Sequence, residues 1–179
     1  MTVQDFEESR FHYGFQNPGQ THIYFAAWPT DAARHFFFTI FPVSMLEQGQ
    51  IHTHTFSFTQ ADVEAFAHIS GDTNPLHLDA EYAAKTVFRR PIMHGFLGAS
   101  VFSKVMGTQF PGEGSIYLKQ SMEFVQPMFT DVVYEAVFTV MEILPKSSAR
   151  IETKIVELES GKTVTLGEAT VMNRQLIPK

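Results

Sequence analysis

The stretch Phe96-Leu-Gly-Ala-Ser-Val-Phe-Ser-Lys-Val-Met106 decides the fold class, because apolar residues occupy nearly every side of the helix that it would form. A helix that is apolar all round lies inside a protein, whereas a surface helix keeps one polar face. The stretch therefore predicts a buried helix, and the rest of the chain must supply the layer that covers it.

Four segments that follow this helix alternate as β-strands do. In the first segment, four apolar residues share one face: Ile116, Leu118, Met122 and Phe124. The expected strands span residues 116–124, 132–143, 149–158 and 163–172. Because short turns join successive strands into an antiparallel sheet, the sequence predicts an α+β fold, with a long antiparallel sheet around one buried helix.

The segment that precedes the buried helix begins with a fifth alternating stretch, residues 51–58. Thr59 and Asp62 then form a capping-box signal for a helix that ends at Gly71. A short helical stretch is expected over residues 80–86. The expected order is therefore strand, helices, buried helix and four strands.

The composition is that of a globular chain of 179 residues, about the size of one domain, with 44% apolar and 18% charged residues. The net charge of −6 argues against nucleic-acid binding, which needs lysine and arginine to neutralise phosphates. The absence of cysteine excludes disulfides and thiolate sites and is compatible with a cytoplasmic location. The most apolar run, His35–Val43, is shorter than the roughly 20 residues of a membrane span.

Residues 1–44 differ from the rest of the chain, because they contain eight of the 18 phenylalanines and show no sustained period. Three interpretations stay open. The segment is an ordered extension that packs on the main domain, a stretch upstream of a true start at Met45, or a partner-binding arm. We expect a domain boundary here, with one domain over residues 45–179.

The loop Ile69-Ser-Gly-Asp-Thr-Asn-Pro-Leu-His-Leu-Asp79 concentrates polar side chains that no hydrophobic period requires. An acid and an imidazole close together can hold a water molecule and move its protons. A second interpretation is structural, since Asp72, Asn74 and Asp79 are also good turn and capping residues. His94-Gly95, just before the buried helix, adds a candidate oxyanion site, because a helix start offers unpaired N–H groups.

Three motifs together carry a family resemblance: Phe66-Ala-His-Ile-Ser-Gly-Asp-Thr-Asn-Pro-Leu-His-Leu-Asp79, Phe88-Arg-Arg-Pro-Ile-Met-His-Gly-Phe-Leu97 and Gly112-Glu-Gly-Ser-Ile-Tyr-Leu118. The region from residue 45 to residue 179 resembles the MaoC-like, (R)-specific enoyl-CoA hydratase family. The resemblance implies a hot-dog fold, in which a long antiparallel sheet wraps a central helix, and a homodimer or tandem pair.

The resemblance also implies roles for single residues. Asp72 and His77 match the catalytic pair that holds the water added to a trans-2-enoyl thioester, and which of them is acid or base stays open. Gly95 matches the residue whose backbone N–H polarises the thioester carbonyl. Asn74 resembles a residue that braces the loop, and Ser103 a supporting hydroxyl.

No metal and no organic cofactor is expected, since coenzyme A is part of the substrate. His52 and His54 share one face of a strand, but no third metal ligand accompanies them. Three basic residues are candidates for contacts with the phosphates of coenzyme A, although solvated surface charge is the alternative interpretation: Arg89, Arg90 and Lys119.

We therefore expect a cytoplasmic, dimeric enzyme, a hydro-lyase that interconverts trans-2-enoyl-CoA and (R)-3-hydroxyacyl-CoA and binds neither nucleic acid nor membranes. One alternative is a 3-hydroxyacyl-[acyl carrier protein] dehydratase of fatty-acid synthesis. Another is a non-catalytic acyl-CoA-binding domain that keeps the fold. A hot-dog thioesterase fits less well, because the Asn-Pro-Leu-His register is typical of hydratases.

Overall fold

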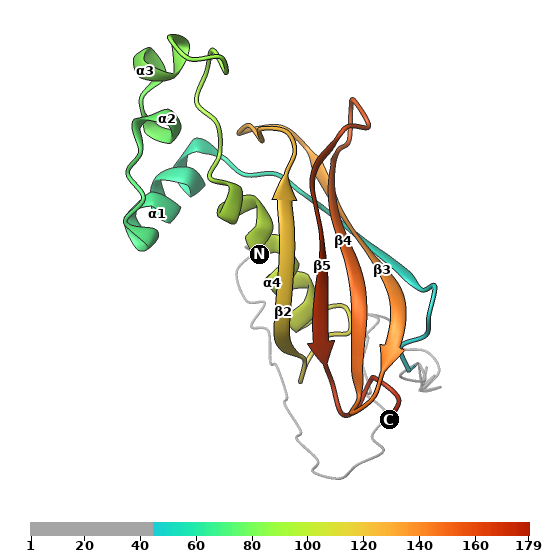
Figure 1. Ribbon diagram of the computed structural model, residues 1–179. Coiled ribbons are helices and arrows are strands. Elements are labelled where there is room, and N and C mark those ends of the chain that lie inside the picture. The colour runs from blue at the N-terminus through green and yellow to red at the C-terminus, as the bar shows by residue number, and fades with distance from the viewer. Residues whose placement is uncertain (1–44) are drawn as a thin grey trace, which may run out of the picture. The chain divides into compact units, whose positions relative to one another are not determined.

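The computed structural model describes residues 45–179 (Figure 1). The expectations for residues 1–44, including the interpretation of that segment as an extension, lie outside the described residues. In the described part of the chain, no helix is long and apolar enough to cross a membrane.

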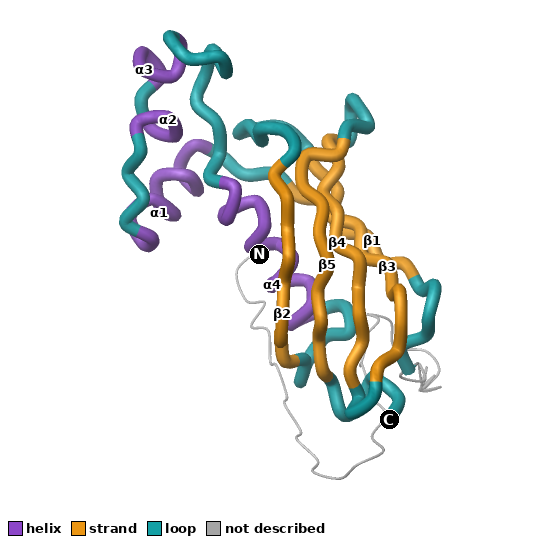
Figure 2. The backbone as a smooth tube through the Cα atoms, in the orientation of Figure 1, coloured by secondary structure: helices purple, strands orange, loops and turns teal. Residues whose placement is uncertain are grey.

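One five-stranded sheet organises this part of the chain (Figure 2). Its strands, in chain order, are β1 (Ile51–Phe56), β2 (Ile116–Phe124), β3 (Tyr134–Leu144), β4 (Ser148–Glu157) and β5 (Thr163–Met172). Their order across the sheet is β1-β3-β4-β5-β2, and every neighbouring pair is antiparallel. The predicted antiparallel sheet is confirmed, and β5 has the predicted limits.

Helix α4 (Gly95–Thr108) lies against this sheet and is the predicted buried helix (Figure 1). Val105 is fully buried, and the ring of Phe102, 1% exposed, meets the ring of Phe138 on β3 at a centroid distance of 5.7 Å. Burying one such side chain contributes about 1.5–3 kcal/mol, and α4 supplies six of the 22 buried residues of the core. The α+β prediction is therefore correct.

Three further helices connect β1 to α4 and gather beyond one end of the sheet (Figure 1): α1 (Gln60–Ser70), α2 (Pro75–Leu78) and α3 (Ala80–Ala84). The predicted capping box is present, because the backbone N–H of Thr59 donates to the Asp62 carboxylate at 2.7 Å and Thr59 Oγ1 accepts from Asp62 N–H. Gly71 ends α1 in the left-handed region, with φ of 78°.

The structure corrects the predicted faces of β2. The alternation places Ile116 and Leu118 with the apolar residues at the other end of the strand, but the pairing register shifts between Tyr117 and Lys119. Such a bulge exchanges the two faces of a strand. Tyr117 therefore pairs with the fully buried Val171 and shares its face, where it is 38% exposed, and its partial burial raises its pKa to about 12. Ile116 and Leu118 are 51% and 53% exposed instead.

Candidate functional site

The loop between α1 and α2 holds two of the predicted site residues by local hydrogen bonds. One carboxylate oxygen of Asp72, Oδ1, accepts the backbone N–H of Asn74 at 3.3 Å, and Asn74 Oδ1 accepts the N–H of Leu76 at 3.0 Å. Asn74 is thus the N-cap of α2, as its side-chain chemistry predicts. The Asp72 side chain is 54% exposed, so the loop presents its carboxylate to a reactant.

His77 lies on α2 and is buried, and a main-chain carbonyl determines the tautomer of its ring. Its Nδ1 is 2.8 Å from the carbonyl oxygen of Ile92. Because a carbonyl oxygen can only accept a hydrogen bond, Nδ1 carries the hydrogen of the neutral ring. The lone pair is therefore on Nε2, which is free to bind a water molecule or take a proton from it.

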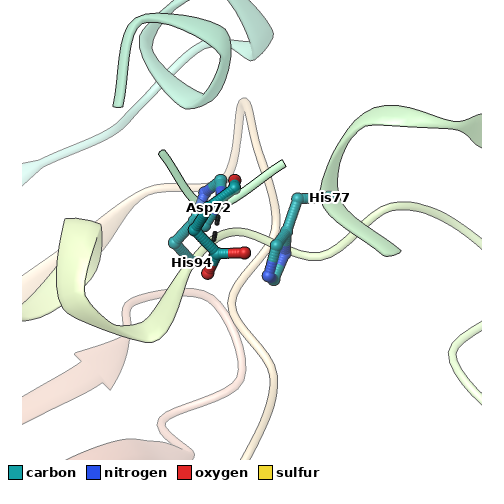
Figure 3. A group of neighbouring side chains, drawn as sticks. All are labelled: Asp72, His77 and His94. Atoms are coloured by element: carbon teal, nitrogen blue, oxygen red, sulfur yellow. Dashed lines mark hydrogen bonds and ion pairs between the residues drawn. The ribbon is translucent and has the colours of Figure 1, made fainter. Parts of the chain in front are cut away.

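His94, which precedes α4, completes the group (Figure 3). Its side chain is 2% exposed, and its ring centroid is 3.8 Å from that of His77. Its Nε2 lies 2.9 Å from the main-chain oxygen of Asp72 and 4.0 Å from Asp72 Oδ2. In Figure 3 the three side chains converge, and a carboxylate oxygen of Asp72 points toward the His77 ring. Residues that are 22 positions apart in the chain thus meet at one point.

These three residues offer one carboxylate oxygen and two imidazole nitrogens within 4.8 Å of one another. The set has two chemical uses. It can hold a water molecule between an acid and a base, or it can contribute ligands to a divalent cation. The first use needs no further group, whereas the second has to replace hydrogen bonds that orient the site.

Gly95 begins α4 beside an elongated cavity of about 380 Å³, a volume typical of small-molecule sites. The cavity is mainly apolar, and His77 and Gly95 both line it, together with Phe96, Phe124, Met128 and Thr165. A Cβ atom on Gly95 would lie 2.9 Å from the Phe124 ring, so a larger residue would collide with the wall. The start of the helix thus opens on an apolar cavity, and an N–H group there can face a bound oxygen.

The structure does not bring the remaining predicted residues into this group. Ser103 is exposed and lies eight residues further along α4, about 12 Å of helix from Gly95. Lys119 pairs with Thr170, so it faces away from α4. The roles suggested for these two side chains stay predictions.

Arg89 and Arg90 follow Phe88, which lines the cavity, so they lie beside its edge. The Arg90 guanidinium carbon is 3.8 Å from the centroid of the Phe129 ring. Arg89 is exposed and has φ of 65°. A contact between these residues and coenzyme A stays a prediction.

Sequence reasoning used His94 only as the marker of a helix start and missed its side chain. One signal was present, since His94 occupies the N-cap position, where Ser, Thr, Asp or Asn is usual, and makes no capping hydrogen bond. Its neighbours Phe66, Asp72 and His77 come from other elements. No periodic pattern links them, so only the tertiary structure identifies the group.

Comparison with known proteins places the chain in a family. The family model of the MaoC like domain matches residues 43–167. The chain belongs to the MaoC-like family. An (R)-specific enoyl-CoA hydratase of Aeromonas caviae is 45% identical over 128 residues, covering 70% of this chain and 94% of that protein. A mitochondrial 3-hydroxyacyl-[acyl-carrier-protein] dehydratase of Arabidopsis thaliana is 32% identical over 132 residues, covering 72% of this chain and 78% of that protein.

Solved structures of the MaoC-like family agree with the fold. An R-hydratase of Pseudomonas aeruginosa in its unliganded form has a TM-score of 0.68 and 41% identity, covering 72% of this chain and 82% of that one. The predicted hot-dog fold is therefore confirmed, as is the predicted membership of the family of MaoC-like hydratases.

Proposed function

We propose that this protein is an (R)-specific enoyl-CoA hydratase, a hydro-lyase that reversibly adds water to trans-2-enoyl-CoA and forms (R)-3-hydroxyacyl-CoA. The observation that carries the proposal is the convergence of the Asp72 carboxylate and the His77 ring beside an apolar cavity. The 45% identity to the Aeromonas caviae hydratase supports the choice of reaction.

In the proposed reaction, Asp72 and His77 Nε2 hold the water molecule from one side of the double bond. The water oxygen bonds to the β-carbon while one of its protons passes to one member of the pair. The other member, which enters the reaction protonated, delivers its proton to the α-carbon and afterwards regains a proton from the first member. Both bonds form on the same face, because both groups approach from the same side. Positioned proton transfer of this kind typically contributes about 10²–10⁴-fold.

Gly95 has a separate role in the proposal. Negative charge develops on the thioester oxygen when water adds, and a fixed N–H group at the start of α4 stabilises that charge. One such donor typically contributes about 10²–10³-fold. The cavity next to Gly95 provides an apolar site for the acyl chain.

The proposed reaction needs neither a metal nor an organic cofactor, because the pair and the N–H group supply proton transfer and charge stabilisation. Chelation tests this part of the proposal. Incubation with EDTA followed by gel filtration is expected to leave the hydration rate unchanged, and a loss of rate that zinc or another divalent cation restores would favour the ligand interpretation of Asp72, His77 and His94.

A homodimer in the cytoplasm is the second part of the proposal. β2 is an edge strand of the sheet, and Ile116 and Leu118 on it are more than half exposed. An edge with unpaired backbone groups and apolar side chains favours pairing with a second copy. Light scattering after size-exclusion chromatography is expected to give twice the chain mass, and Leu118→Lys is expected to shift the protein toward monomer. Cell fractionation tests the location.

Two basic residues beside the cavity, Arg89 and Arg90, are the proposed contacts for the phosphates of coenzyme A. Substituting each by Gln is expected to raise KM for enoyl-CoA and leave kcat unchanged, since the phosphates are remote from the reacting bond. Lys119 is the third candidate, on the sheet face turned away from α4, and Lys119→Gln tests it in the same assay.

Hydration of crotonyl-CoA by the purified protein tests the reaction itself, followed as loss of the enoyl absorbance. The proposal expects turnover and an (R)-3-hydroxy product, and no turnover on enoyl-CoA of any chain length would overturn it. Identity to the Arabidopsis dehydratase supports one alternative, so the same assay is run with an enoyl thioester of acyl carrier protein. A higher kcat/KM on the carrier protein would favour the dehydratase, and binding without turnover would favour a non-catalytic domain.

A further inference from the structure

The segment Ile92–Gly95, which precedes and begins α4, contacts three parts of the candidate site. The carbonyl oxygen of Ile92 binds the His77 ring, the side chain of His94 binds the main chain of Asp72, and Gly95 lines the cavity. This segment therefore connects the loop that carries the carboxylate to the helix that carries the imidazole. Of these contacts, the one made by His94 belongs to a side chain with no assigned role.

Burying the polar ring of His94 lowers the stability of the fold, so a functional reason for the residue is expected. The side chain is 2% exposed, and Nδ1 is buried without a hydrogen-bond partner among residues 45–179. A buried polar atom without a partner lowers stability, and an apolar side chain at the same place would avoid that cost. His94 also makes no capping hydrogen bond for α4, so the helix start does not explain it.

The contacts of His94 act on both members of the pair. Its Nε2 donates to the carbonyl oxygen of Asp72 at 2.9 Å, so this nitrogen carries the hydrogen. Its ring centroid lies 3.8 Å from that of His77, and the Phe66 ring of α1 packs at a centroid distance of 5.1 Å. Within residues 45–179, the Asp72 carboxylate accepts one hydrogen bond, the long one from Asn74 N–H at 3.3 Å, and the Asp72 N–H donates to Ser70 Oγ at 3.2 Å.

We infer that His94 is a positioning residue for the Asp72 and His77 pair, holding the Asp72 main chain through Nε2–H and the His77 ring through close ring packing. The inference rests on the proposed hydratase function. His94 does not touch the substrate in this role; it sets the distance between the two groups that do. Small misplacements of reacting groups cost about 10²-fold in rate, so loss of this contact is expected to lower kcat more than it changes KM.

Two substitutions of similar polarity test the inference. In His94→Gln, the side-chain amide nitrogen can occupy the position of Nε2 and donate to the Asp72 carbonyl. The asparagine side chain of His94→Asn is shorter, so its amide nitrogen lies at the position of Nδ1 and cannot reach that carbonyl. We expect His94→Asn to lower kcat for crotonyl-CoA about 10–100-fold with KM within about threefold of the wild type. His94→Gln is expected to recover about tenfold of that loss, the equivalent of one hydrogen bond.

Phe66→Leu is the matched control, because it changes an apolar neighbour of the His94 ring and leaves the hydrogen bond of that ring in place. Its kcat is expected to stay within about threefold of the wild type. Equal kcat values for the Gln and Asn variants, or a wild-type kcat for the Asn variant, would overturn the inference. A wild-type enzyme without turnover would instead overturn the proposed function.

If a variant does not fold, a measurement on the wild-type protein still tests the inference. Nitrogen-15 spectra of histidine-labelled protein are expected to give a slowly exchanging Nε2–H for His94 and an Nδ1–H for His77. An Nδ1–H tautomer of His94 would contradict the donor contact with Asp72 and overturn the inference.

Discussion

Two pairs of histidines meet the two ends of α4, and their surroundings differ. At the carboxyl end, His54 Nε2 lies 3.2 Å from the ammonium of Lys104, and His52 Nε2 lies 3.4 Å from the side-chain oxygen of Gln109. Both contacts are solvent-exposed. At the amino end, His77 and His94 are buried, and a main-chain carbonyl binds one ring nitrogen of each.

Two histidines that are close together in the chain do not by themselves form a functional site. His52 and His54 are two residues apart on β1 and share a face, yet an ammonium group lies next to one of them. A neighbouring cation disfavours both a metal ion and a positive imidazole. His77 and His94 are 17 residues apart, but the fold brings their ring centroids within 3.8 Å, and main-chain carbonyls fix their tautomers. Burial with directed hydrogen bonds distinguishes the second pair.

The largest effect is expected at the amino end of α4. Asp72→Asn and His77→Gln each remove one proton-transfer group and preserve its approximate shape. We expect either substitution to lower kcat on crotonyl-CoA by about 10²–10⁴-fold with little change in thermal stability. Steady-state kinetics and thermal melts measure the two quantities. Full activity of both variants would remove these residues from the mechanism and leave the reaction class standing.

A smaller effect is expected for Gly95→Ala. The added Cβ would lie 2.9 Å from Cε1 of Phe124, so the ring must move and the cavity wall with it. We expect kcat/KM to fall at least about tenfold, since the carbonyl can no longer reach the N–H group. The double variant Gly95→Ala/Phe124→Leu separates crowding from the loss of the donor. Recovery of activity in the double variant would assign the defect to crowding, and wild-type activity of the single variant would argue against an oxyanion role.

Little effect on rate is expected at the carboxyl end. His52→Gln and His54→Gln change half-buried side chains that contact Gln109 and Lys104 and are not among the residues that line the cavity. We expect kcat and KM within about twofold of the wild type. A loss comparable to that of His77→Gln would break the distinction between the two pairs.

The smallest effect concerns stability in acid. Burial, the Lys104 ammonium and His52 lower the pKa of His54 below its usual value. The unfolded chain therefore binds this proton more readily, so the contribution of His54 to stability is present above its unfolded pKa and is lost as pH falls through the folded pKa. Because the ring is only half-buried and solvent screens its charge, we expect less than about 1 kcal/mol.

Urea unfolding at pH 7.5 and 5.5 measures this contribution. The His54→Gln variant is expected to lose less free energy of unfolding on acidification than the wild type. A larger loss in the variant would show that His54 is not the group responsible.

The order of the helices and strands was predictable from the sequence, because capping residues and hydrophobic periods act between residues that are near one another in the chain. The Thr59 and Asp62 capping box and the left-handed Gly71 bound α1 as predicted. The bulge in β2 was not predictable, since residues 116–118 alternate like any strand and only pairing with β5 shows where the register shifts. Strand ends elsewhere moved by one or two residues, as at β1, which ends at Phe56 rather than residue 58.

The reactive groups of the candidate site were predictable from the sequence alone: a carboxylate, an imidazole and a glycine before an apolar helix. Those groups are covalent properties of Asp72, His77 and Gly95, and the motif places the first two five residues apart in the chain. Which nitrogen of His77 is free depends on the tertiary structure, and so does the position of His94 beside the His77 ring. Both follow from carbonyl oxygens of residues far along the chain, and only folding brings a distant main-chain acceptor within 3 Å of a ring nitrogen.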